Sequence, residues 1–258
     1  MSSSSPAKCQ LHVFLDIDET LVQYADIDLW NALSAAERIK YETVDHEGKG
    51  IFVMRPHLRE FLDFLFENAK VSLWTLSDQK YAEFVAKHIV LRSRPKTAKL
   101  QHIYSSDTGT NEAEDMHGNS KDLNYIWYDV QPRNSAECNT ILIDDNVNNA
   151  LNPSNRRNAI VLPPFTLWSS KKLGHAYTDR SKDTALMDIV ALLRRVLPNI
   201  TNCYHDDRRW ENIFSRANIE NYGIEDAVQH LNFKGQKVPA ISVGLKRTTG
   251  GKRTYKKK

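Results

Sequence analysis

The sequence has only three cysteines and lacks the features that mark secreted or membrane-bound proteins. Cys9, Cys138 and Cys203 are far apart and form no CxxC pair, which argues against a disulfide framework or a zinc site. No apolar run approaches the roughly 20 residues that a membrane span needs. The polar start MSSSSPAK lacks the apolar core of a signal peptide and the arginines of a transit peptide. We therefore expect an intracellular protein, in the nucleus or the cytoplasm, with no membrane partner.

Two common phosphate-binding motifs are also missing. The chain contains neither GxxxxGK[ST] nor GxGxxG, which argues against a P-loop or a dinucleotide site. Its 258 residues, of which 41% are hydrophobic and 26% charged, are ordinary for a globular protein. The length and composition predict one large domain, or one large domain with a short appendage.

Positive charge is concentrated at the C-terminus. The last 13 residues carry seven of the 35 Lys and Arg residues and no acid, which leaves 28 basic against 32 acidic side chains elsewhere. This tail, residues 246–258, has no aliphatic pattern and is expected to be disordered. The alternative is that the tail binds nucleic acid or an acidic partner.

Alternating strand and helix patterns predict an α/β fold with a mostly parallel sheet flanked by helices. Apolar runs predict strands at "HVFLDID", "VSLWT", "TILID" and "AIVLPP", and two short extended runs lie between Tyr41 and Met54. Helical spacing predicts three helices. Their apolar faces are Leu58, Phe61, Leu62, Leu65 and Phe66; Tyr81, Phe84, Val85, His88 and Ile89; and Leu186, Ile189, Val190 and Leu193.

The pattern weakens between Val90 and Glu137, where only "LQHIYSS" resembles a strand. We expect a small insertion there, at roughly residues 91–120. Only 56 residues separate Asp18 from Thr75, and the strand pair and helix expected there use about half of them. No large cap domain is therefore expected.

Polar side chains follow three of the predicted strands. Asp16 and Asp18 end the first, Thr75 follows the second, and Asp144 and Asp145 end the third. In an open parallel sheet the carboxyl ends of the strands share one crevice. With Lys121, from "GNSKDL", the crevice would contain oxygen ligands for Mg²⁺, a hydroxyl group and a cation for phosphate, which are the parts of a phosphoryl-transfer site. An Asp carboxylate can also serve as the nucleophile.

The segments that contain these residues resemble the motifs of a known family. "DIDETLV" is similar to the DxDx[TV] signature of haloacid-dehalogenase-type (HAD) phosphotransferases, and more closely to the DLDETL form of the NLI-interacting-factor-like, or FCP/SCP-type, phosphatases. "RPHLREFL", "WTLSDQKYAEFV", "HGNSKDL" and "LIDDN" resemble further motifs of that family, in the family's order. The resemblance covers roughly residues 10 to 197 and implies a HAD-like Rossmannoid fold.

The resemblance also implies a role for each site residue. Asp16 would be the nucleophile and a magnesium ligand, and Asp18 would ligate through its backbone carbonyl and act as general acid, then base. Thr75 would bind the phosphate, Lys121 would neutralise it, and Asp145 would complete the Mg²⁺ ligands. Asp144 would orient Lys121 or a metal-bound water. The implied activity is a magnesium-dependent phosphatase acting through an aspartyl phosphate, on phosphoserine or phosphothreonine in proteins.

Three other kinds of protein share some of these features. A phosphatase of nucleic-acid ends would use the same chemistry and would suit the basic tail. A receiver domain also has clustered acids, a Thr and a Lys, but its acid pair and phosphoacceptor lie on different strands, whereas Asp16 and Asp18 share one. A catalytically weak binding module of the same fold would usually have lost one of these acids.

The same interpretation divides the chain into four parts. We expect a flexible N-terminus at residues 1–9, the phosphatase domain at 10–197, a C-terminal helical extension at 198–245, and the tail. His57 and His117 are expected to be structural, and the five tryptophans are expected to lie mostly in the core.

Overall fold

The computed structural model describes residues 10–107, 121–130, 139–146, 148–149, 155, 158–168 and 175–197. Within these residues a five-stranded sheet has the order β6-β5-β1-β7-β8, and all of its pairings are parallel. The predicted α/β fold is therefore confirmed. The strands are β1 (Leu11–Leu15), β5 (Ala69–Trp74), β6 (Leu100–Tyr104), β7 (Thr140–Asp144) and β8 (Ala159–Val161).

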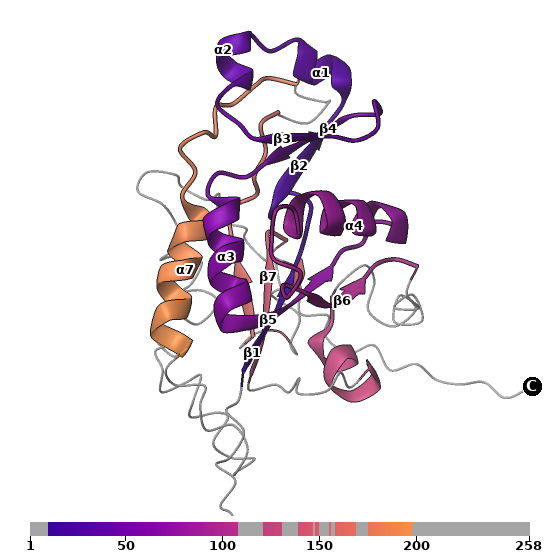
Figure 1. The fold of residues 1–258 in the computed structure, drawn as a ribbon, viewed down its shortest axis with the longest axis vertical. Coiled ribbons are helices and arrows are strands. Elements are labelled where there is room, and N and C mark those ends of the chain that lie inside the picture. The colour runs from indigo at the N-terminus through magenta and orange to yellow at the C-terminus, as the bar shows by residue number, and fades with distance from the viewer. Residues whose placement is uncertain are drawn as a thin grey trace, which may run out of the picture.

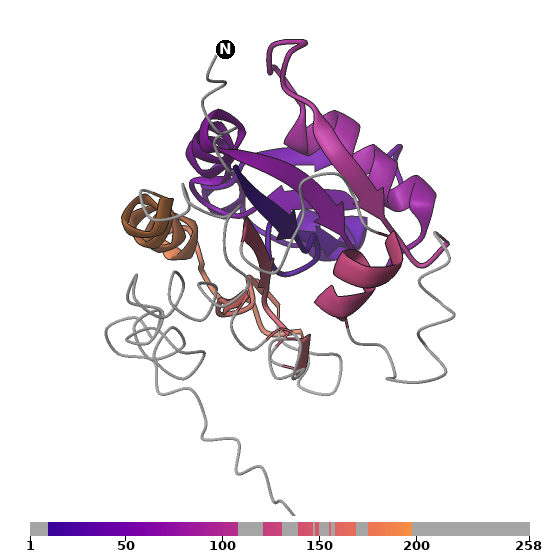
Figure 2. The ribbon, with the colours of Figure 1, turned by 90° about the horizontal axis from the view of Figure 1, so that it is seen from below.

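Helices cover both faces of the sheet, as Figures 1 and 2 show. Leu11, Val13 and Leu15 of β1 are in one apolar core with α3 (Leu58–Asn68), α4 (Gln79–Val85) and α7 (Ala185–Val196). Phe14 lies in a second core with residues of η3 (Tyr125–Val130), a π-helical segment. Successive side chains of a strand point to opposite faces, so β1, buried along its whole length, needs both cores.

The predicted helices are confirmed. The expected face of α3 is buried at Leu58, Phe61, Leu62 and Leu65, and α7 is continuous over 12 residues. α4 begins after Asp78, whose side chain accepts a 2.8 Å hydrogen bond from the Tyr81 backbone N–H. A π-helical turn, η1 (Ala86–Val90), continues α4.

A smaller antiparallel sheet lies at the top of Figure 1, beyond the end of β1. Its order is β2-β4-β3, with β2 (Val22–Ala25), β3 (Thr43–Asp45) and β4 (Ile51–Met54). Two short helices, α1 (Ile27–Asn31) and α2 (Ala35–Arg38), connect β2 to β3. We call β2, β3 and β4 the inserted sheet. The sequence predicts β3 and β4 but not β2, α1 or α2, and these few elements fill the space between β1 and α3 without forming a large cap.

Part of the predicted insertion belongs to the main sheet. β6 pairs with β5 at the sheet edge, so the described half of residues 91–120 contributes an edge strand of the main sheet rather than a separate subdomain. The remainder of that insertion, the N-terminus before residue 10 and everything after residue 197 lie outside the described residues.

Arg55 holds the turn that follows Asp18. Its side chain is buried and forms two hydrogen bonds to the carboxylate of Asp183, at 2.9 and 3.0 Å. It also donates to the backbone carbonyls of Thr20, at 3.2 Å, and Pro163, at 2.8 Å. Glu19, in the same turn, has a φ of 60°, a left-handed conformation that is costly for a residue with a side chain. These contacts stabilise the strained turn.

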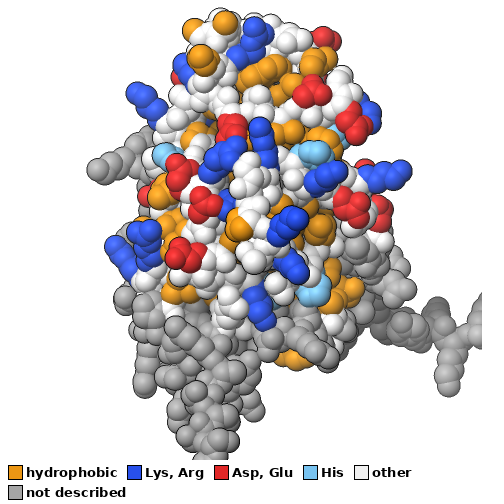
Figure 3. Space-filling view, in the orientation of Figure 1, with side chains coloured by type: hydrophobic (Ala, Val, Ile, Leu, Met, Phe, Trp, Pro, Cys, Tyr) orange, Lys and Arg blue, Asp and Glu red, His pale blue; other side chains and the backbone are white. Residues whose placement is uncertain are grey.

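Charges of both signs are interspersed over the described part of the face in Figure 3. Among the described residues, no helix is both long and apolar enough to cross a membrane.

Candidate active site

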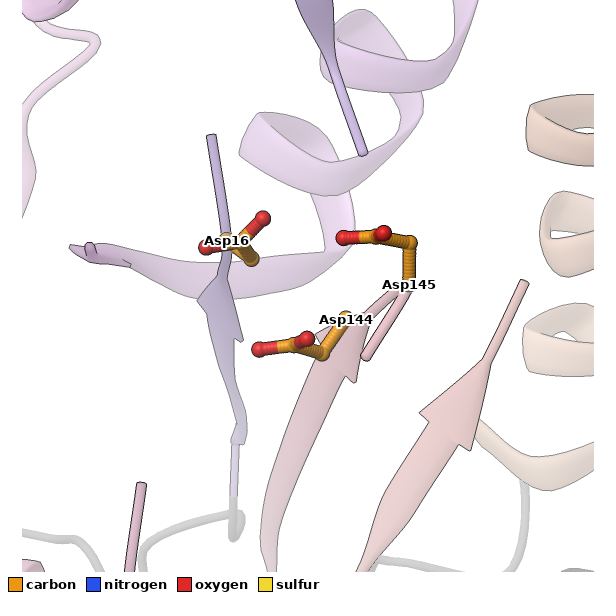
Figure 4. Close-up of side chains that lie close together, drawn as sticks. All are labelled: Asp16, Asp144 and Asp145. Atoms are coloured by element: carbon orange, nitrogen blue, oxygen red, sulfur yellow. The ribbon is translucent and has the colours of Figure 1, made fainter. Parts of the chain in front are cut away.

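The carboxyl ends of β1, β5 and β7 open into one cavity of about 490 Å³. All five site residues predicted from the sequence line it, together with Asp144. Figure 4 shows Asp16 at the end of β1 facing Asp144 and Asp145 at the end of β7. β1 and β7 are neighbours, which brings residues about 130 positions apart in the sequence to one edge of the sheet. The other lining residues are Glu19, Leu76, Ser77, Asn146, Asn148 and Asn149.

Lys121 bridges two of the aspartates. Its Nζ donates to Asp16 Oδ1 and, at 2.7 Å, to Asp144 Oδ2. Burial acts to lower the pKa of Lys121, but attraction to both carboxylates outweighs burial and raises it. Burial also raises the pKa of Asp16 to about 6, and Lys121 opposes this rise. Lys121 is therefore the cation that favours ionised Asp16 in this buried position.

Two buried asparagines hold Lys121 in place, and the sequence patterns do not predict them. Asn149 accepts the Lys121 backbone N–H at 3.0 Å and donates to Asp144 Oδ2 at 2.9 Å. Asn155 donates to the carbonyls of Lys121 and Asn149, at 2.5 and 2.7 Å, and accepts from the Leu123 N–H at 2.9 Å. The lysine segment is thus fastened to the loop after β7. The only sequence feature that could have indicated this is the asparagine-rich stretch "NVNNALNPSN".

Two side chains that follow β5 in the sequence contact Asp18. Tyr81 donates its hydroxyl to Asp18 Oδ1, and Ser77 Oγ donates to Oδ2 at 3.2 Å. Burial raises the pKa of Asp18, while the donors Tyr81 and Ser77 act against the rise. Thr75 is buried, and its Oγ1 accepts the Ser77 backbone N–H at 3.1 Å.

Asp145 is held by the β1 turn. Thr20 Oγ1 donates to Asp145 Oδ1 at 3.2 Å and accepts the Asp145 backbone N–H at 3.0 Å. Burial raises the pKa of Asp145 to about 7, and repulsion from Asp16 and Asp144 adds to this rise. A positive charge nearby would lower this pKa and favour ionised Asp145.

The residues present fit a divalent metal. One carboxylate oxygen from each of Asp16, Asp144 and Asp145 lies within 4.8 Å of the other two. Carboxylate oxygens are the ligands that hard divalent cations prefer, and a cation would relieve the repulsion that raises the pKa of Asp145. Both oxygens of Asp144 already accept hydrogen bonds, Oδ2 from Lys121 and Asn149 and Oδ1 from the Asn146 N–H, so the pair Asp16 and Asp145 is the better candidate for direct ligation.

His57 is separate from this cluster. It precedes α3, is partly exposed, lies 3.9 Å from Glu60, and is not among the described residues that line the cavity. His117 lies outside the described residues. Trp30, Trp74 and Trp127 are buried, as expected of core residues.

Comparison with known proteins identifies several relatives. A putative CTD phosphatase-like protein of invertebrate iridescent virus 3 is 35% identical over 120 residues, covering 44% of this chain and 64% of the viral protein. Its counterpart in invertebrate iridescent virus 6 is 26% identical over 193 residues, covering 72% and 98%. A ubiquitin-like domain-containing CTD phosphatase of Arabidopsis thaliana is 26% identical over 191 residues, covering 70% and 51%.

Among solved structures, Fcp1, described as an essential RNA polymerase II CTD phosphatase, matches with a TM-score of 0.44 and 14% identity. The match covers 83% of this chain and 64% of Fcp1. The chain thus spans nearly all of one viral relative, and between half and two thirds of the other proteins named here.

The family is shown by a sequence profile that matches most of this chain. The sequence profile of NLI interacting factor-like phosphatases matches residues 11–203, which runs from the first strand of the main sheet to beyond α7. Because the match extends over most of the chain, the chain belongs to the NLI interacting factor-like phosphatase family.

Proposed function

We propose that the protein is a HAD-type phosphatase that acts on phosphoserine or phosphothreonine in proteins through a phosphorylated Asp16. The observation that carries this proposal is the ion pair between Lys121 and Asp16 inside a cavity that Asp18 also lines. A buried carboxylate beside a lysine is suited to attack a phosphate dianion, because the lysine reduces the repulsion between the two anions. Both acids required for turnover are present, which favours an enzyme over a binding module.

In the first step a carboxylate oxygen of Asp16 attacks phosphorus, and the bond between phosphorus and the substrate's hydroxyl oxygen breaks. Asp18 gives its proton to that departing oxygen, so the alcohol leaves neutral. In the second step Asp18, now ionised, takes a proton from water, and the water oxygen attacks phosphorus. The bond to Asp16 then breaks, which releases inorganic phosphate and restores both carboxyl groups. Lys121 and the Thr75 hydroxyl would contact the phosphate oxygens throughout.

Mg²⁺ is the proposed metal, held by Asp16, Asp145 and the backbone carbonyl of Asp18. When bound, it cancels negative charge that would otherwise repel the phosphate. Thr20 holds Asp145 in position for this role. Lys121 and the bound cation would together supply the positive charge that attracts a phosphate group.

We expect EDTA to abolish hydrolysis of p-nitrophenyl phosphate and Mg²⁺ to restore it. Asp145→Ala should raise the Mg²⁺ concentration for half-maximal activity at least about tenfold, because one ligand is lost. Asp28→Ala, at an exposed position of α1, is the control and should leave that concentration unchanged. Unaltered Mg²⁺ dependence in Asp145→Ala would contradict the assignment of Asp145.

The substrate proposal rests on the openness of the site. None of the described residues of the inserted sheet lines the cavity, so that sheet does not close over it. An open site can accept a side chain presented by a peptide, but it surrounds a free metabolite with few contacts. The relatives described as CTD phosphatases support a protein substrate.

A substrate panel tests this proposal. We expect kcat/KM for phosphoserine or phosphothreonine peptides to exceed that for free sugar and nucleotide phosphates by at least about tenfold, since only the peptides add contacts outside the cavity. Oligonucleotides with 3′- or 5′-phosphates form the third group. Preference for a free metabolite would contradict the open-site argument. Preference for oligonucleotides would favour the alternative substrate, for which the basic tail, outside the described residues, is the only support.

A further inference from the structure

The carboxyl group of Asp18 is held by side chains from a different part of the fold. Asp18 follows β1, whereas its donors Ser77 and Tyr81 belong to the segment after β5 and to α4. Ser77 is itself fixed, because its N–H donates to Thr75 and its carbonyl accepts the Ser106 N–H at 3.0 Å. The orientation of Asp18 therefore depends on contacts that span about 60 residues of sequence.

Both the backbone and the ring of Tyr81 are held in place. Its backbone N–H is bonded to Asp78 at the start of α4. Its ring packs against Phe52, Tyr24 and His46, with centroid separations of 5.3, 6.3 and 6.4 Å. Tyr24 is on β2, Phe52 is on β4, and His46 lies in the turn between β3 and β4. The inserted sheet thus forms the wall against which the Tyr81 ring rests.

Ring packing alone does not require the hydroxyl to point at Asp18. A phenylalanine would fill the same space, and a tyrosine that served only as packing could direct its hydroxyl to a carbonyl or to solvent. Here the hydroxyl donates to Oδ1 of the proposed general acid, while Oδ2 has a longer contact of 3.2 Å with Ser77. With one donor on each oxygen, the plane of the Asp18 carboxyl group is fixed.

We propose that Tyr81 is a positioning residue for Asp18, and that the inserted sheet serves to hold Tyr81 rather than to cover the substrate. The inference rests on the proposed function, in which Asp18 protonates the leaving oxygen. In this proposal the hydroxyl of Tyr81 orients Asp18. The aromatic rings of the inserted sheet hold the ring of Tyr81 in place.

The dependence of kcat/KM on the leaving group distinguishes a residue that positions Asp18 from a residue that only supports the fold. An alkyl oxygen, as in phosphoserine, must be protonated as it departs, whereas p-nitrophenolate is stable enough to leave without a proton. The ratio kcat/KM covers events up to the first irreversible step, so it reports on leaving-group departure and not on hydrolysis of the phosphorylated Asp16. Misplacing Asp18 should therefore affect the phosphoserine substrate far more than p-nitrophenyl phosphate.

The experiment compares Tyr81→Phe with Tyr24→Phe in the full chain. We expect Tyr81→Phe to lower kcat/KM for a phosphoserine peptide about 10- to 100-fold and that for p-nitrophenyl phosphate less than about threefold. Tyr24→Phe is the matched control. It removes a hydroxyl from the same group of packed rings, but that hydroxyl lies against Gly50, and neither substrate should be affected. Thermal unfolding of both variants checks that the packing is retained.

Asp18→Asn serves as the reference. It should lower kcat/KM for the phosphoserine peptide about 100- to 10,000-fold, again with a smaller effect on p-nitrophenyl phosphate. Adding Tyr81→Phe to Asp18→Asn should lower either value less than about threefold further, because the hydroxyl acts through Asp18.

Each contrary outcome identifies which proposal fails. Equal effects of Asp18→Asn on the two substrates would overturn the role of Asp18 in the proposed function. If Asp18→Asn discriminates between the substrates but Tyr81→Phe behaves like Tyr24→Phe, the positioning role is wrong and the phosphatase proposal is unaffected. An equal loss for both substrates in Tyr81→Phe would make Tyr81 a structural residue and would also overturn the inference.

Discussion

Asp16→Asn is expected to lower kcat at least about 1,000-fold for every phosphate ester, because an amide cannot take the place of the attacking carboxylate. The substitution keeps the size of the side chain, and Lys121 keeps its 2.7 Å bond to Asp144. The protein should therefore stay folded. Steady-state hydrolysis of p-nitrophenyl phosphate and of a phosphoserine peptide measures the loss.

Covalent labelling gives a second measure of the same prediction. Rapid quenching with ³²P-labelled substrate should trap label on wild-type protein but not on Asp16→Asn. Asp28→Asn, the same chemical change at an exposed position of α1, is the control and should label normally. Turnover close to wild type in Asp16→Asn would mean that another group, or water, is the nucleophile.

Lys121→Met is expected to reduce both activity and stability. Lys121 is 2% exposed and pairs with two buried carboxylates, so its replacement by an apolar side chain of similar length leaves Asp16 and Asp144 facing each other without a cation. Breaking a buried ion pair in this way costs about 3–5 kcal/mol of unfolding free energy. Activity should fall at least about 100-fold, since the phosphate loses a positive contact. Urea unfolding and p-nitrophenyl phosphate assays measure the two effects.

Asp144→Asn combined with Lys121→Met tests the physical reason. If carboxylate repulsion causes the instability, the double variant should be more stable than Lys121→Met alone, because only one buried carboxylate of the pair remains. Activity should stay low in both variants. An unfolding free energy of Lys121→Met within about 1 kcal/mol of wild type would show that the ion pair contributes little to stability.

Much of the fold was predictable because local patterns report on burial. α3 and α7 extend over 11 and 12 residues, long enough for the helical spacing of apolar side chains to be read. Four strands of the main sheet, β1, β5, β7 and β8, appear as apolar runs because they are buried almost throughout. In contrast, α1 and α2 have only five and four residues, which is too short for a helical period to be distinguished.

The sequence was sufficient to predict which residues gather at the candidate site. Asp16, Asp18, Thr75, Lys121 and Asp145 were all predicted, and all line the cavity. For Asp16, Asp18, Thr75 and Asp145 this was possible because parallel strands that end in polar residues present those residues at a single edge of the sheet. Lys121 directly follows none of the described strands and was predicted from the motif that contains it. Their roles in catalysis remain predictions.

The side chains that support these residues are evident only in the folded protein. Asn149 and Asn155 reach Lys121 across 28 and 34 positions, and Tyr81 reaches Asp18 across 63. Such hydrogen bonds depend on the path of loops and on how the inserted sheet packs against α4. Neither feature produces a periodic pattern of apolar residues in the sequence. In the sequence Tyr81 is one apolar residue on a helix face, and the direction of its hydroxyl is set by the rings around it.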